Sequence, residues 1–320
     1  MVLAVIWVNG WTDAAGAIAT VVSSGALGER PAVVLAALCN LLGVGVMTAL
    51  CPTVAQTMQE LVDFGPRPSA ALTALAAALF AVLLWATVCW VFGLPTSESH
   101  GLIAGLTGAA LALGQGLSAL NPAPWAKAAL GLAFSSLAGL VGGFLCARLA
   151  GRLPFREGSP FFRRAQIFGA AAMAFFHGAQ DGQKFLALFL LALSLGNPGF
   201  SGAAPLWLLV LCACLMGLGT ACGGGRIIRT VGVQMVQLSP SQGFGADLAG
   251  AVCLLFSCLW GLPVSTTHVK TVAMMGAGSA AGRGEVDKST VRELFLAWGL
   301  TFPACLLLGY LAARAALILL

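Results

Sequence analysis

The chain has 320 residues, of which 59% are hydrophobic and only 8% charged, and its mean hydropathy is +0.95. A typical soluble domain carries about a quarter charged residues, so this composition excludes a soluble fold. The formal net charge of +5 comes without a basic face of interleaved aromatic residues, which favours arginines in loops at a membrane surface over nucleic-acid binding.

Apolar segments long enough to cross a bilayer, which takes roughly 18 to 25 residues, recur along nearly the whole chain. They include residues 31–51, 70–92, 207–222 and 294–320. The apolar start of the chain runs into Asn9 and Asp13 without a preceding basic region, so we interpret it as part of the first spanning element and not as a signal peptide. The pattern predicts an all-α polytopic membrane protein.

Two motifs occur twice in the chain. NGWTDAAG begins at Asn9 and its counterpart HGAQDGQK at His177, while GLPTSESH begins at Gly93 and GLPVSTTH at Gly261. Both pairs have the same offset, since 177 − 9 and 261 − 93 both give 168. This constant offset indicates an internal duplication. We predict a first transmembrane repeat over residues 1–150, a cytoplasmic arginine-rich linker over 151–164 and a second transmembrane repeat over 165–320, each repeat containing a broken helix and a helical hairpin.

The arginines between residues 148 and 164 place this segment in the cytoplasm by the positive-inside rule. If residues 70–92 and 97–117 form a re-entrant hairpin, the first half crosses the membrane three times and the second half is inverted. This topology leaves both termini outside the plasma (inner) membrane. It places inside the basic residues Arg226, Arg229, Arg283, Lys288 and Arg292. A full crossing by residues 70–92 would make the count even, and the charges would no longer fit.

Both Gly-Leu-Pro segments interrupt apolar runs at matching positions of the two repeats, a pattern that points to a binding site at the bilayer midplane. The hydroxyl residues that follow are Thr96, Ser97 and Ser99 in the first half and Ser265, Thr266 and Thr267 in the second. A helix N-terminus supplies free N–H donors and a partial positive charge, so two such tips would enclose an anion. Ordinary helix capping is the alternative, and it explains one such segment better than two related ones.

Asp13 and Asp181 lie in apolar surroundings, where a charge costs about 2.5–3.5 kcal/mol. Each therefore needs a counter-charge. The Gly-Trp pair before Asp13 and the glycines at 178 and 182 predict breaks in both helices, whose freed carbonyl oxygens would join the carboxylates around a hard cation such as sodium. The alternative is that each aspartate only caps its own helix.

Lys184 follows Asp181 by three residues, so a structural ion pair and direct contact with a substrate are both open. The three histidines, His100, His177 and His268, all lie in the repeated motifs, and imidazole titrates near neutral pH. A role in proton transfer is one interpretation. For His100 and His268 we favour a hydrogen bond that locks the hairpin tip.

Glu98 and Lys270 are the other charged residues of the two hairpins, and neither is repeated in the opposite half. Either residue tunes one half of the site or faces a water-filled vestibule.

The segment NGWTDAAGAIATVVSSGAL resembles the signature NGANDAANAIAT of the inorganic phosphate transporter family, the sodium- or proton-coupled phosphate permeases. HGAQDGQK is similar to its second copy, HGSNDGQK, and the two Gly-Leu-Pro segments resemble its hairpin tips. The resemblance implies an inverted, duplicated homodimer that carries phosphate. It implies cation binding by Asn9, Asp13, Asp181 and Gln183, and anion binding by Ser97, Ser99, Ser265, Thr266 and Thr267.

The chain departs from this signature at Thr12, Gly16 and Gln180, where the family pattern has asparagine. Proton coupling through Asp13, Asp181, Glu98 or a histidine is therefore an alternative to sodium coupling.

We predict cation-coupled transport of inorganic phosphate across the lipid bilayer by alternating access, with sodium or a proton as the coupling ion and no other cofactor. Because some family members carry sulfate, a permease for sulfate or another tetrahedral oxyanion is an alternative. A membrane anion sensor that does not transport is another. The chain contains no nucleophile elbow and no HExxH motif, so we do not expect an enzyme.

Overall fold

The computed structural model describes residues 1–197, 199–200, 204–222, 225–280 and 286–319. Over these residues the chain is helical and contains no strand, which confirms the predicted all-α fold. The first half contains α1 (Val2–Thr12), α2 (Ala14–Ala17), α3 (Ala19–Ser23), α4 (Glu29–Leu50), α5 (Thr53–Gln59), α6 (Pro68–Val91), α7 (Glu98–Ala112), the 3-10 turn η1 (Gly116–Ala119) and α8 (Pro122–Ala150). The second half contains α9 (Pro160–Gly196), α10 (Leu206–Ala221), α11 (Gly225–Arg229), the π-helical turn η2 (Thr230–Met235), α12 (Pro240–Trp260), α13 (Thr266–Ala280) and α14 (Lys288–Ile318).

The duplication extends from the motifs to the helices. Adding 168 to the bounds of α7, 98 and 112, gives 266 and 280, which are the bounds of α13. The packing follows the same rule, because α7 packs against α14 of the second half while α13 packs against α8 of the first. In the same way α4 packs against α9, and α10 packs against α1. Each half thus packs its helices against those of the other half, and the two sets of contacts interchange when the halves are exchanged.

The helix that carries Asp13 is interrupted, whereas the helix that carries Asp181 is not. The first helix stops at Thr12, and α2 and α3 follow as two short pieces. In contrast, α9 continues from Pro160 to Gly196, so the predicted break at residues 178–182 is wrong. The glycines of this segment serve close packing against α4, because a Cβ at Gly178 would lie 2.4 Å from the main-chain oxygen of Asn40.

Among the described residues, five helices are long and apolar enough to cross a membrane: α4, α6, α8, α12 and α14. By length and composition α6 can cross fully, so its length does not support the re-entrant arm predicted over residues 70–92. Their outward faces carry large exposed side chains such as Leu42, Leu137 and Leu307, as expected of surfaces that meet lipid. The hairpin arms α7 and α13 have 15 residues each, about 22 Å, and are too short to span a hydrocarbon core of about 30 Å. The chain is an integral membrane protein whose two short arms end inside the helix bundle.

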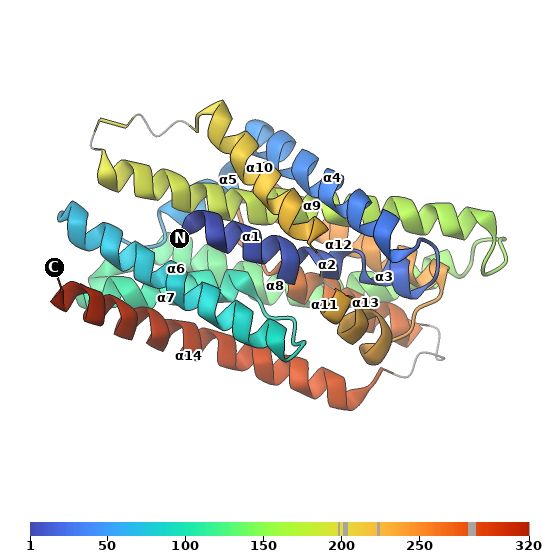
Figure 1. The fold of residues 1–320 in the computed structure, drawn as a ribbon. Coiled ribbons are helices and arrows are strands. Elements are labelled where there is room, and N and C mark those ends of the chain that lie inside the picture. Colours follow the sequence, from blue (N-terminus) through green and yellow to red (C-terminus); the bar gives the residue numbers. More distant parts are fainter. Residues whose placement is uncertain (198, 201–203, 223–224, 281–285, 320) are drawn as a thin grey trace.

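The arginine-rich connection between the halves runs over residues 151–159, and Arg163 and Arg164 lie in the first turns of α9. Figure 1 shows α9 beginning beside the end of α8 at one end of the bundle and finishing at the opposite end, where the C-terminus also lies. Arg283 lies outside the described residues.

Candidate functional site

The tips of the two hairpins meet in the centre of the helix bundle. The Ser99 hydroxyl donates a hydrogen bond of 2.9 Å to the main-chain oxygen of Val264, and the Thr267 hydroxyl donates one of 3.1 Å to that of Thr96. These two bonds are equivalent in the repeat, since 99 + 168 gives 267 and 96 + 168 gives 264. Each tip therefore holds the other by the same interaction.

The histidines of the tips also meet. The rings of His100 and His268 have centroids 4.6 Å apart, and the His268 and Trp298 rings have centroids 3.8 Å apart with their planes tilted by 33°. Within the first tip, His100 Nδ1 lies 2.6 Å from the Ser97 hydroxyl. The predicted hydrogen bond that locks the tip is thus present at His100, while His268 makes ring contacts.

A pair of buried carboxylates lies beside the tip of the second hairpin. The Thr266 hydroxyl lies 3.0 Å from Asp13 Oδ2 and 3.2 Å from Asp181 Oδ2, so one hydroxyl hydrogen is shared between the two aspartates. The Thr267 hydroxyl, which also lies 3.1 Å from the Thr96 oxygen, shares its one hydrogen with the other oxygen of Asp13. The exposed fractions of Asp13 and Asp181 are 6% and 2%. Two buried carboxylates that share one donor need a positive charge close by.

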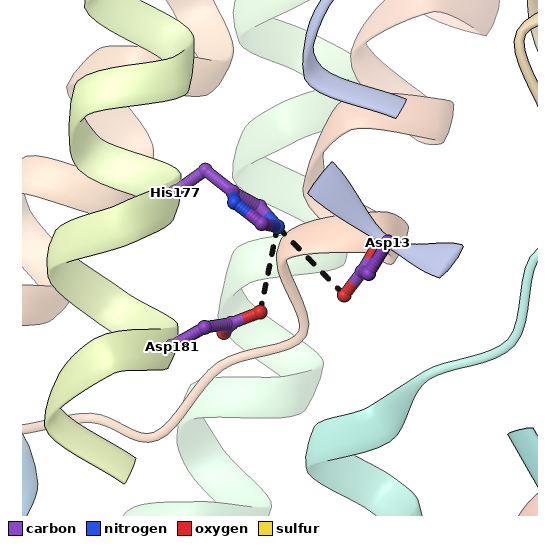
Figure 2. Close-up of side chains that lie close together, drawn as sticks. All are labelled: Asp13, His177 and Asp181. Carbon is purple, nitrogen blue, oxygen red and sulfur yellow. Dashed lines mark ion pairs between the residues drawn. The ribbon is translucent and has the colours of Figure 1, made fainter. Parts of the chain in front are cut away.

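His177 lies between these aspartates. Figure 2 shows its ring, on α9, turned towards both carboxylates. Its Nε2 is 3.4 Å from Asp181 Oδ2 and 3.9 Å from Asp13 Oδ2, and this nitrogen makes no hydrogen bond to the described residues. Its Nδ1 is held 3.2 Å from the side-chain oxygen of Asn40 on α4. The ligand atoms of Asp13, His177 and Asp181 all lie within 4.8 Å of one another, an arrangement that can hold a cation.

Lys184 places an ammonium group in the site. Its ammonium lies 2.7 Å from Asp181 Oδ1, 2.5 Å from the Ser99 hydroxyl and 2.6 Å from the main-chain oxygen of Val264. The structural ion pair with Asp181 is therefore formed, and the same ammonium bonds to both hairpin tips.

Asn9, Thr12 and Glu98 complete the site on the side of α1. The Asn9 amide donates a bond of 3.1 Å to Asp181 Oδ2, and the Thr12 hydroxyl lies 2.7 Å from Glu98 Oε1. Asn9 Oδ1 and Glu98 Oε2 are buried and make no hydrogen bond to the described residues. Glu98 and Lys270 are only 3% and 2% exposed, so the expectation that either faces a water-filled vestibule is wrong.

Some predicted residues have other partners. The Gln183 oxygen accepts hydrogen bonds from Val54 N and Ala55 N at the start of α5, and no hydrogen bond to the aspartates is found among the described residues. The hydroxyls of Ser97 and Ser265 accept from the N–H groups of His100 and His268, which is ordinary helix capping.

Thr96 bonds to Thr301 on α14, at 2.9 Å. At the positions where the chain departs from the family signature, Gln180 donates to the main-chain oxygen of Leu262, and a Cβ at Gly16 would meet nothing within 4 Å.

Sequence reasoning missed several residues of this region. Asn40 is a polar side chain in the apolar segment 31–51, a signal that would have identified it. Trp298 donates to the main-chain oxygen of Pro95 at 3.1 Å, which no sequence pattern indicates. The oxygen of Val264 is a main-chain atom whose role depends only on the fold.

Comparison with known proteins agrees with this arrangement. The model of the phosphate transporter family matches the chain twice, over residues 9–158 and 152–309, once for each half. The chain belongs to the phosphate transporter family. This phosphate transporter family member is 35% identical to a probable low-affinity inorganic phosphate transporter of Bacillus subtilis. The alignment covers 97% of this chain and 93% of that relative. A relative of the same description from Rhizobium meliloti is also 35% identical, over 97% of this chain and 92% of its own.

One solved structure has the same fold. It is described as the sodium-dependent phosphate transporter and superposes on this chain with a TM-score of 0.88 at 21% sequence identity. The superposition covers 100% of this chain and 98% of the chain of the solved structure. The relatives are named as transporters, in agreement with the expectation that this family member is not an enzyme.

Proposed function

We propose that the protein transports inorganic phosphate across the membrane together with a cation, by alternating access. Phosphate would bind between the hairpin tips, and the coupling cation, sodium or a proton, would bind among Asp13, His177 and Asp181. The observation that carries this proposal is the Thr266 hydroxyl, which joins the second hairpin to the aspartates of both halves at 3.0 and 3.2 Å. A hairpin tip that binds an anion is thereby in direct contact with groups that bind a cation.

The charges of the site support coupling. Three carboxyl groups, those of Asp13, Glu98 and Asp181, lie together with the Lys184 ammonium and the His177 imidazole. An anion bound beside these carboxylates is repelled unless cations accompany it. Oxygen ligands suit sodium, and an imidazole between two carboxylates suits a proton, so both coupling ions remain in the proposal.

The closed tips support alternating access. The site residues Asp13, Glu98, Asp181 and Thr266 are buried, and the two symmetric bonds join the tips. Release of one tip at a time would open the site to one side of the membrane.

We further propose that the two halves are inverted, that the protein lies in the plasma (inner) membrane with both termini outside, and that it forms a homodimer. The cluster of arginines at residues 148–164 supports the orientation. The family resemblance supports the homodimer.

Uptake of labelled phosphate into proteoliposomes tests the proposed function. With an inward gradient of either sodium or protons, phosphate should accumulate, and comparison of the two gradients identifies the coupling ion. Asp13→Asn and Asp181→Asn should each abolish uptake. A matched control is Asp63→Asn, which changes an exposed carboxylate that accepts a hydrogen bond from the N–H of Gly65, and should leave uptake unchanged.

Uptake of sulfate but not phosphate by the same vesicles would overturn the choice of substrate. Thermal stabilisation by phosphate without flux in either direction would overturn transport and favour an anion sensor.

A further inference from the structure

A second buried ionic cluster lies outside the site described above. Lys270 on α13 forms an ion pair with Asp247 on α12. The Lys270 ammonium also lies 3.0 Å from the Thr20 hydroxyl and 3.2 Å from the main-chain oxygen of Ala17. Lys270 is 2% exposed and Asp247 is fully buried. No step of the proposed transport uses these residues.

The Asp247 carboxylate has partners on both oxygens. The Thr20 hydroxyl lies 2.9 and 2.8 Å from them, and the Gln166 amide donates a bond of 2.7 Å to Oδ2. The cluster thus joins the interrupted first helix to three helices of the second half, α9, α12 and α13. Ala17 is the last residue of α2, so its carbonyl lies where that helix is interrupted before α3.

Lys270 and Lys184 have the same kinds of ligand. Each ammonium meets one carboxylate oxygen, one hydroxyl oxygen and one main-chain carbonyl oxygen. Carboxylate, hydroxyl and carbonyl oxygens, including a carbonyl at a helix break, are the ligands that hard cations take in membrane transporters. Both ammonium groups therefore occupy positions with the chemistry of a sodium site.

The equivalent position in the other half is apolar. Subtracting 168 from 247 and 270 gives Leu79 and Leu102, and adding 168 to 20 gives Leu188. All three leucines are buried in one hydrophobic cluster. The fold therefore forms at this position without any charge. A buried ion pair is in general no more stabilising than well-packed apolar residues, so stability alone does not account for Asp247 and Lys270.

We propose that Lys270 is a tethered cation, whose ammonium fills an oxygen cage formed by Ala17, Thr20 and Asp247 that accepts sodium when the lysine side chain is removed. The functional part of this inference rests on the proposed phosphate transport. Because the ammonium cannot leave, this cage contributes no ion to the transport cycle. The exchangeable cation then belongs to Asp13, His177 and Asp181.

Thermal unfolding of the purified full-length protein in detergent tests the cage directly. The variants are purified in sodium chloride, and melting is compared in sodium chloride and in choline chloride at equal ionic strength, without phosphate. Lys270→Ala should melt at a higher temperature in sodium than in choline, by a margin larger than that of the wild type. Lys270→Ala combined with Asp247→Asn should lose this extra margin, because the cage has no carboxylate.

A matched control is Leu102→Ala, which removes a side chain of similar size at the equivalent apolar position. Its sodium response should equal that of the wild type, since an apolar cavity does not hold a cation. An equal sodium response in Lys270→Ala and in this control would overturn the proposal.

If sodium fills the cage, Lys270→Ala should fold in sodium chloride. Failure of this variant to fold there would therefore also overturn the proposal, whether or not the double variant folds. In proteoliposomes with a fixed proton gradient, phosphate uptake by Lys270→Ala should depend on sodium more strongly than uptake by the wild type does. Absence of uptake by the wild type would refute the proposed transport and leave the melting result as a separate test of the cage.

Discussion

Substitution of Gly178 by alanine tests how the packing of α9 against α4 supports the site. An added Cβ would lie 2.4 Å from the main-chain oxygen of Asn40 and 2.6 Å from its Cα. These are backbone atoms and cannot rotate away. Since ordinary contact begins at 3.4 Å, the two helices must separate by about 1 Å, the difference between 3.4 and 2.4. Overpacking of this kind costs about 1–3 kcal/mol.

The same displacement affects the site, because Asn40 holds His177 Nδ1 at 3.2 Å. A shift of about 1 Å lengthens this contact to about 4.2 Å, beyond a hydrogen bond. His177 then loses the partner that directs its Nε2 towards the two aspartates. We therefore expect Gly178→Ala to lower both the melting temperature in detergent and the initial rate of phosphate uptake in proteoliposomes.

Gly45→Ala on α4 is the matched control, because a Cβ there meets nothing within 4 Å. It gains the helix propensity of alanine, up to about 1 kcal/mol, without a clash. The difference in unfolding free energy between the two variants therefore isolates the overpacking, and should be about 1–3 kcal/mol. Equal melting temperatures for the two variants would refute the reasoning.

Two further substitutions test the hydrogen bonds of individual side chains. Gln183→Leu removes the acceptor of two N–H groups at the start of α5, and should lower the free energy of unfolding by about 1–3 kcal/mol. The cation concentration for half-maximal uptake should not change, and a change would show that Gln183 is a cation ligand. Trp298→Phe removes the hydrogen bond to the Pro95 oxygen and should lower the free energy of unfolding by about 0.5–1.5 kcal/mol. Trp207→Phe changes an exposed tryptophan and should not lower it. Equal melting temperatures for the two variants would show that the bond to Pro95 does not stabilise the protein.

Much of the fold could be predicted from the sequence because the duplication constrains it. The offset of 168 and the Gly-Leu-Pro tips indicated two hairpins that meet, and the contacts from Ser99 to Val264 and from Thr267 to Thr96 join them. The break near residue 180 was wrongly predicted, because glycine permits both a helix break and close packing of two helices. At Gly178 the neighbouring backbone of Asn40 decides between the two, and that backbone lies 138 residues away, since 178 − 40 is 138.

The candidate site could be predicted only in part for the same reason. Asp13 and Asp181 were evident because buried charges are rare in apolar segments. In contrast, the cage around Lys270 depends on Asp247, which the repeated motifs do not contain, and on a main-chain oxygen of Ala17. Pairing between such distant positions has no sequence signal in a single chain.

The duplication also explains how a symmetric fold acquires a site of mixed charge. Positions related by 168 pair Gly16 with Lys184 and Glu98 with Thr266. In each pair one half carries a neutral residue and the other a charged one, and the charged residues of both halves lie at the meeting point of the tips.

A single substitution at one of these positions, in either copy, therefore changes the charge of the shared site. Lys184 adds a positive charge in this way, and Glu98 adds a negative one. In the proposed transport, the number of cations that accompany phosphate therefore depends on the charges that these pairs add to the site, while both copies keep the aspartate.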